Sequence, residues 1–178
     1  MIYCIAIGAV ALLLIVWIIS VHRSIVAMDE NINNAISQID VQLASCWDVL
    51  TSLLDLAKGY VTLEYETLTH IVQARQSITK DSTPEDISNQ EYIIAEALEQ
   101  IMEVAESYPD LKENTTFIKN LDGVKQYEKM IHTSQLIYNH SVTKLNCNIC
   151  RFPVFLIAGA LGFRKRAYLE TGNRNHSL

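Results

Sequence analysis

The sequence feature that most constrains the fold of this chain is one long stripe of apolar residues. Between Ser24 and Ile78 an apolar side chain recurs every three or four residues, no proline interrupts the run, and only Glu64 and Thr67 in the stripe are clearly polar. This spacing keeps one face of an α-helix apolar. We therefore predict one long helix over 24–78 that packs on partner helices. The stripe consists of Ile32, Ile36, Ile39, Leu43, Cys46, Leu50, Leu53, Ala57, Tyr60, Glu64, Thr67, Ile71, Ala74 and Ile78.

Composition narrows both the fold class and the partners. The 178 residues include three Pro and six Gly and show few alternating runs of the kind that strands need, which favours an all-α fold. The formal net charge is −6. Because phosphate binding needs a concentrated basic face, this balance excludes nucleic acid as a partner.

The N-terminus predicts a membrane anchor. Residues 2–21 carry no charge and are long enough, at ~1.5 Å per residue, to cross a ~30 Å hydrocarbon core. A cleaved signal peptide is the alternative, but the run lacks a basic start and a cleavage site. His22 and Arg23 follow the span, so the positive-inside rule favours a cytoplasmic location for the rest of the chain. We expect an anchor over 1–23, a helical domain over 24–170 and a disordered tail over 171–178.

Two further long helices follow, after a first helix that we expect to end near Lys80. Thr83 can cap the second helix, with Pro84 in its first position and Asp86 completing a capping box, and Tyr108 ends it before a proline. The third is predicted to run from after Asn114 to Phe152. Pro153 then ends this helix or begins a short fourth one that reaches about Glu170.

The predicted fold is an N-terminal transmembrane helix followed by an antiparallel up-and-down bundle of three long helices and one short C-terminal helix. If the long helices run up, down and up, the first is the longest, and its membrane-near part forms an uncovered stalk. The apolar stretch from Phe152 to Phe163 would then lie at the membrane-distal tip. This argues against an in-plane membrane anchor there, although Arg164-Lys165-Arg166 follows. We expect the stretch to be an apolar contact patch for the bundle or a partner: Phe152, Pro153, Phe155, Leu161 and Phe163.

Several polar residues lie on or beside the apolar stripes of the predicted first and third helices. They could form a ligand pocket between these helices. The interpretation we favour is a buried pairing layer that fixes the helix register, because nothing among them indicates a reaction. The set is Asp40, Glu64, Arg75, Glu128, Gln135 and Asn139.

Cys147 and Cys150 form a C-x-x-C pair that could indicate redox or metal chemistry. No second Cys or His pair completes a zinc site, and no strand precedes the pair as in redox folds. The five histidines show no ligand spacing. We therefore expect no catalytic residue, no cofactor and no metal, and predict that the protein is not an enzyme.

Short runs spread over nearly the whole chain resemble the LemA family. This resemblance implies a membrane anchor followed by a bundle of long helices, and it implies no defined chemistry. The chain departs from the family pattern at Ser45 and Cys46, where members often carry paired Arg, and at Leu63 and Gln135, where members carry His and Arg. The matching runs are SQIDVQL (37–43), KGY (58–60), QAR (73–75), AEALEQIMEVAESYPDLK (95–112), YN (138–139), FP (152–153) and GFRKRAY (162–168).

The function that these features favour is binding. We expect a single-span membrane protein that acts as a scaffold or assembly factor for a protein partner of unknown identity. The alternatives are a sensor in which a ligand between helices moves the anchor, and a redox protein that uses Cys147 and Cys150.

Overall fold

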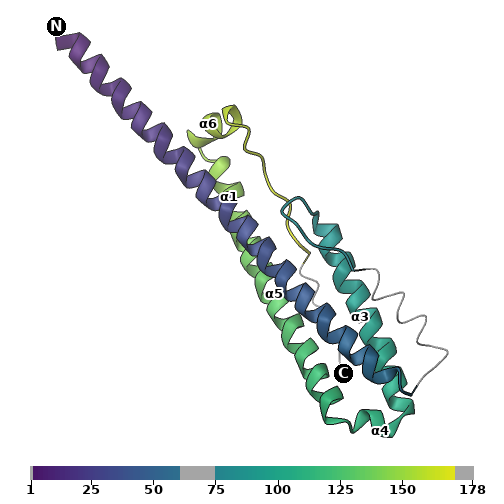
Figure 1. Cartoon of the computed structure of the whole chain (residues 1–178). Coiled ribbons are helices and arrows are strands. Elements are labelled where there is room, and N and C mark those ends of the chain that lie inside the picture. The colour runs from purple at the N-terminus through teal and green to yellow at the C-terminus, as the bar shows by residue number, and fades with distance from the viewer. Residues whose placement is uncertain (1, 61–74, 171–178) are drawn as a thin grey trace. The chain divides into compact units, whose positions relative to one another are not determined.

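The predicted all-α class is confirmed by the computed structural model, which describes residues 2–60 and 75–170 (Figure 1). These residues contain no strand. The predicted tail and the stripe positions from Glu64 to Ala74 lie outside them. The helices are α1 (Ile2–Ala57), α3 (Pro84–Ser107), α4 (Pro109–Lys112), α5 (Thr115–Ile149) and α6 (Val154–Ala160).

The chain forms two compact units. The first unit combines Met1–Asn34 with Tyr138–Tyr168, and the second combines Ala35–Ile137 with Leu169–Leu178. Both α1 and α5 therefore contribute to each unit. The first unit brings together two segments that are far apart in the sequence.

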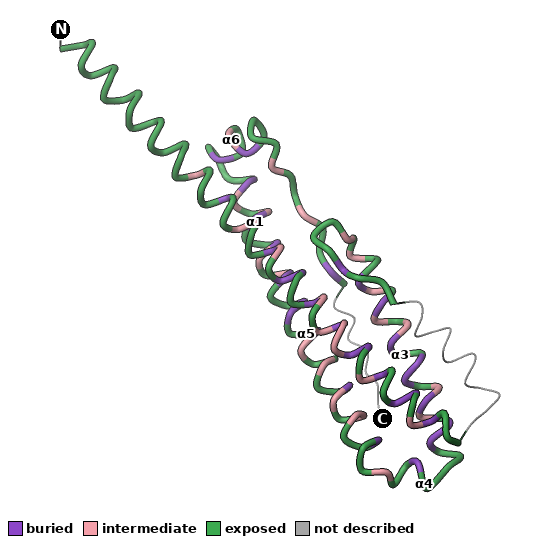
Figure 2. Tube along the Cα trace, in the orientation of Figure 1, coloured by how far each residue is buried: buried purple, intermediate pink, exposed green. Residues whose placement is uncertain are grey.

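The second unit has the core that the apolar stripes predict. Figure 2 shows buried positions recurring along α1, α3 and α5. Trp47 of α1 is also buried, whereas Leu121 of α5 is only partly buried. The buried apolar residues include Ile36, Ile39, Leu43, Cys46, Leu50 and Leu53 of α1, Ile87, Ile94, Leu98 and Ile101 of α3, and Phe117, Val124 and Ile131 of α5.

The direction of α3 corrects the expectation that the long helices run up, down and up. The ring of Tyr60, just after α1, lies 5.9 Å from the ring of Tyr108, just after α3. Both helices therefore end at the same end of the second unit, and α3 runs parallel to α1 (Figure 1). The short α4 then turns the chain, so α5 runs antiparallel to both.

The expectation that the first helix continues to Ile78 is wrong. Helix α1 ends at Ala57, a turn follows over 58–60, and residues 75–79 are not helical. Gly59 weakens the helix at this point. Beyond it, side chains replace the helical hydrogen bonds: the Ile78 N–H donates to Asp40 Oδ1 (2.9 Å), and the Gln76 N–H donates to Gln90 Oε1 (3.0 Å).

The starts of α3 and α5 are as predicted. Thr83 Oγ1 accepts from the Asp86 N–H (3.2 Å), and Asp86 Oδ2 accepts from the Thr83 N–H (2.7 Å), which completes the capping box. Asn114 Oδ1 accepts from the Phe117 N–H (3.3 Å) and so caps α5. At its other end α5 stops at Ile149, three residues earlier than expected.

The first unit overturns the predicted stalk. Ile25, four residues beyond the apolar run, is fully buried, and Phe163 packs edge-on against His22 with ring centroids 6.1 Å apart. The apolar stretch that contains α6 therefore lies beside the point where α1 leaves its span, and not at a membrane-distal tip. The physical reason is packing within the first unit: Arg166, in the segment after α6, pairs with Asp29 of α1 (3.0 Å) and so holds this stretch beside the start of the packed part of α1.

The predicted fourth helix is also shorter than expected. Helix α6 ends at Ala160, and residues 163–170 are not helical. Gly162 has φ = 80°, and the Phe163 N–H donates to Ala158 O (3.0 Å) while the Gly162 N–H donates to Gly159 O (3.2 Å). These two bonds form a Schellman motif, which glycine at this position favours.

Helix α1 is the one helix in the described ranges that is long and apolar enough to cross a membrane. None of its apolar window is buried within the protein, as expected for a surface that faces lipid.

Candidate functional site

The non-helical segment after α6 is held by one asparagine of α5. Asn146 Oδ1 accepts from the Arg166 N–H (3.0 Å), and Asn146 Nδ2 donates to Arg166 O (2.9 Å). The carboxamide thus satisfies both backbone groups of one residue, as a neighbouring strand would. This local pairing lets the segment follow α5 without a sheet.

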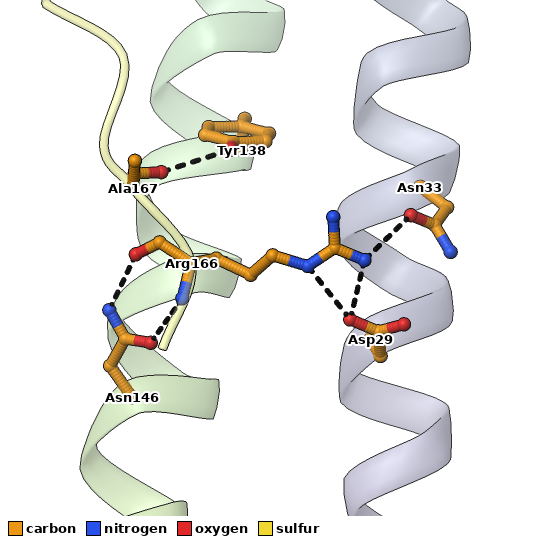
Figure 3. A network of polar contacts seen from close by, with 6 residues as sticks. All are labelled: Asp29, Asn33, Tyr138, Asn146, Arg166 and Ala167. Carbon is orange, nitrogen blue, oxygen red and sulfur yellow. Dashed lines mark hydrogen bonds and ion pairs between the residues drawn. The ribbon is translucent and has the colours of Figure 1, made fainter. Parts of the chain in front are cut away.

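The side chain of Arg166 then reaches from this segment to α1, as Figure 3 shows. Its Nε and Nη2 donate to Asp29 Oδ1 at 3.2 and 3.0 Å, and Nη2 also donates to Asn33 Oδ1 at 3.4 Å. The side chains of Arg166 and Asp29 are 35% and 29% exposed, so the ion pair is only partly screened by water. We call Arg166, Asp29, Asn33 and Asn146 the clamp.

Tyr138 adds a further contact on the same segment. Its hydroxyl donates to Ala167 O (2.9 Å), and its side chain extends from α5 toward the segment (Figure 3). Burial raises the pKa of Tyr138, and the nearby charge of Arg166 opposes this rise only in part. The phenol is therefore neutral at physiological pH and available as a donor.

A mostly exposed apolar surface surrounds α6. Phe152 is 77% exposed, while Val154 and Ala158 are buried and attach α6 to the first unit. Phe163 of the predicted contact patch is partly covered by its contact with His22. Sequence reasoning missed Leu156, which belongs to the same surface. We call the exposed large residues Phe152 (77%), Phe155 (47%), Leu156 (58%) and Leu161 (46%) the α6 surface, and Pro153 between them is also exposed.

Three members of the predicted polar set each bind a residue outside the set, and they do so in separate contacts. Asp40 accepts from the Ile78 N–H, Arg75 Nη1 pairs with Asp48 Oδ1 (3.0 Å), and Gln135 Nε2 donates to Glu91 Oε1. Gln135 is buried, and its bond joins α5 to α3, as a pairing layer would. Arg75 is exposed.

The other three members of the predicted polar set are Glu128, Asn139 and Glu64. Glu128 is exposed on α5, and its charge contributes, after burial, to raising the pKa of Cys46 to about 12. Asn139 belongs to the first unit and is partly buried. Glu64 lies outside the described residues.

Cys147 and Cys150 are the residues that could indicate redox or metal chemistry. Cys147 on α5 and Cys150 just after it are both free and exposed. Over residues 2–60 and 75–170, no three His, Cys, Asp or Glu side chains come together in a way that could hold a metal ion.

Sequence reasoning missed the clamp. The one available signal was the run GFRKRAY, in which Arg166 is the third of three basic residues. Nothing in the run distinguishes Arg166 from its exposed neighbours Arg164 and Lys165, and its partners are far away in sequence.

Comparison with known proteins agrees with the motifs. The family model described as "LemA family" matches residues 35–177. The match covers most of the chain and begins after the apolar run. A search of curated proteins finds no match.

Proposed function

Because this chain belongs to the LemA family, we propose that it works by binding, as a membrane-tethered scaffold or assembly factor for other membrane proteins. The observation that carries the proposal is the absence of a linker between the span and the packed helices in the first unit. Ile25 is fully buried only four residues after the apolar run ends at Val21. The first unit is therefore built directly onto the anchor.

The clamp supports this role. It joins Asp29, about two helical turns beyond the span, to the segment that follows α6. Helix α1 is thus fixed to α5 and to the C-terminal segment close to the bilayer. The first unit, held this way, presents its surfaces at a constant height, where the exposed loops of membrane proteins lie.

Photocrosslinking in cells tests the proposal. A photoreactive amino acid is placed at exposed positions of the first unit, Val26 (43% exposed) and Tyr168 (50% exposed), with buried Val142 as the matched control. We expect one of the exposed positions to give a reproducible adduct with a membrane protein and Val142 to give none. Adducts no more abundant than those at Val142, across a scan of exposed positions of this unit, would contradict a scaffold.

A second experiment tests the tether itself. A flexible Gly-Ser insertion between Arg23 and Ser24 separates the span from the packed part of α1 and leaves both sequences intact. If constant height matters, the adduct is lost while the amount of protein in the membrane stays the same. An adduct that survives the insertion would show that the tether serves only to concentrate the protein at the membrane.

The proposed location of the helical domain is the cytoplasmic side. His22 and Arg23 follow the span, and Arg151, Arg164 and Lys165 are exposed in the same unit. The test is thiol labelling at an exposed position, Ser107→Cys, after the three exposed cysteines are replaced by Ser. We expect a membrane-impermeant maleimide to label this residue only after the cells are permeabilised, and labelling of intact cells would reverse the assignment.

A further inference from the structure

The α6 surface exposes more apolar area than a water-facing segment of this length needs. Four large apolar side chains between residues 152 and 161 are 46–77% exposed. Val154 and Ala158 hold α6 in place from its other side, so these four residues are fixed in their outward position. Exposed apolar patches of this kind indicate a contact site.

The place of the surface within the first unit indicates what it contacts. Phe163, two residues after the surface, packs on His22, the first polar residue after the span. Val21, the last residue of the apolar run, is partly buried, whereas residues 2–20 are exposed. The α6 surface therefore lies at the level where α1 leaves the bilayer, and an exposed apolar group at that level meets lipid.

The charges around the surface agree with a bilayer. Arg151 precedes it, Arg164 and Lys165 follow it, and all three are exposed. No Asp or Glu occurs between residues 151 and 169. Apolar side chains bracketed by cations are typical of segments that lie in the interface of an anionic leaflet. The same charges disfavour a second copy of this chain, because a two-fold contact would bring like charges together.

We propose that residues 151–165 form a second membrane contact. The α6 surface enters the interfacial layer of the leaflet that α1 leaves, and Arg151, Arg164 and Lys165 contact anionic headgroups. The protein is then attached to one bilayer at two points, the span and α6, which also fixes the rotation of α1 about its own axis. This contact would exist whether or not the protein acts as a scaffold.

Depth-dependent quenching on the full chain in vesicles tests the proposal. In a background with the three exposed cysteines replaced by Ser, Leu156→Cys carries an environment-sensitive fluorophore. The matched control is Glu30→Cys, an exposed position on α1 two turns beyond His22 in the same unit. The vesicles contain phosphatidylcholine and phosphatidylglycerol, and the quenchers are a nitroxide-bearing lipid or aqueous iodide.

We expect the probe at 156 to lose emission to the nitroxide lipid and to be protected from iodide, and the probe at 30 to show the opposite. A probe at 156 that behaves like the one at 30 would overturn the proposal. Protection at 156 from both quenchers would overturn it too, because a protein surface would then cover α6.

The headgroup contact has its own test. Arg164→Gln with Lys165→Gln removes two exposed charges and leaves the clamp residues unchanged. In vesicles rich in phosphatidylglycerol we expect this variant to show weaker lipid quenching at 156 than the parent, and the difference to vanish in pure phosphatidylcholine. If the variant and the parent are quenched equally in both kinds of vesicle, the assignment of Arg164 and Lys165 to headgroups is refuted. Hydrogen exchange at the Arg166 amide reports whether the fold is kept.

Discussion

Replacing Arg166 with Ala should release the segment after α6 from α1. The change removes two N–H···O contacts to Asp29 Oδ1, at 3.2 and 3.0 Å, and the longer contact to Asn33. Hydrogen bonds to charged groups contribute about 1.5–3 kcal/mol each, whereas exposed ion pairs contribute about 0.2–1 kcal/mol. Since both side chains are about one-third exposed, we expect the free energy of opening the segment to fall by about 1–2 kcal/mol.

Amide hydrogen exchange on the full chain in nanodiscs measures this loss where it occurs. The Arg166 N–H is bonded to Asn146 Oδ1, so its exchange reports opening of the segment. A loss of about 1–2 kcal/mol raises the opening constant by roughly 5–30-fold. Arg166→Lys keeps the charge but loses the planar fork, and we expect an intermediate increase.

The matched control for Arg166→Ala is Arg164→Ala, a change in the same basic run. Arg164 is exposed two residues earlier, and Arg164→Ala should leave the exchange at residue 166 unchanged. Exchange in Arg166→Ala that matches exchange in Arg164→Ala would show that the ion pair does not hold the segment. Asn146→Ala serves as the positive control, because it removes the acceptor of the amide itself.

Three further predictions concern single residues. Gly162→Ala should lower the free energy of unfolding by about 1 kcal/mol, because Gly162 has φ = 80°. Gly159 lies inside α6 with open space around it, so Gly159→Ala should not lower the free energy of unfolding. Thermal melts compare the two variants. The hydrogen bonds from Thr83 lower the pKa of Asp86 below 3.8. The stability that its charge contributes is therefore complete above pH 3.8 and is lost as the pH falls through the lowered pKa. The free energies of unfolding of wild type and Asp86→Asn should differ above pH 3.8 and converge in acid. Burial raises the pKa of Cys46 to about 12, so at pH 8 a maleimide should modify Cys147 and Cys150 quickly and Cys46 only in denaturant. Fast modification of Cys46 in the folded protein would contradict its burial.

The helices and their apolar faces could be predicted because their signals are local. The stripe on α1, the capping box at Thr83 and the start of α5 after Asn114 each involve residues within a few turns of one another. Such patterns depend on helix geometry, which is the same in every protein. The capping box, the start of α5 and the stripe as far as Ala57 are confirmed, whereas the stripe positions Tyr60 and Ile78 lie outside any helix.

The end of α1 and the direction of α3 could not be predicted in this way. The apolar spacing continues past Ala57, and only Gly59 hints at a stop. What decides the outcome is tertiary: Asp40 and Gln90 accept hydrogen bonds from Ile78 and Gln76, which gives a non-helical backbone its partners. The error in this one boundary then carried over into the stalk and into the position of α6.

The candidate site was predicted in part. The predicted apolar patch contains three of the four α6 surface residues, because large apolar side chains around a proline are visible in sequence. Its location was wrong, because it depended on helix directions. The clamp was not predicted, because Arg166 and Asp29 are separated by 137 positions and neither carries a local signal.

The pairing of Asp29 with Arg166 has a consequence for biosynthesis. The apolar N-terminus enters the bilayer early, yet the partner of Asp29 is made 137 residues later, which at about 5–20 residues per second is a delay of roughly 7–27 seconds. During that interval Ile25 and Ile32, fully buried in the finished protein, have no α5 to cover them. The nascent protein therefore spends its synthesis as an inserted helix with an open flank, which chaperones or neighbouring membrane segments can occupy until the last part of the chain arrives.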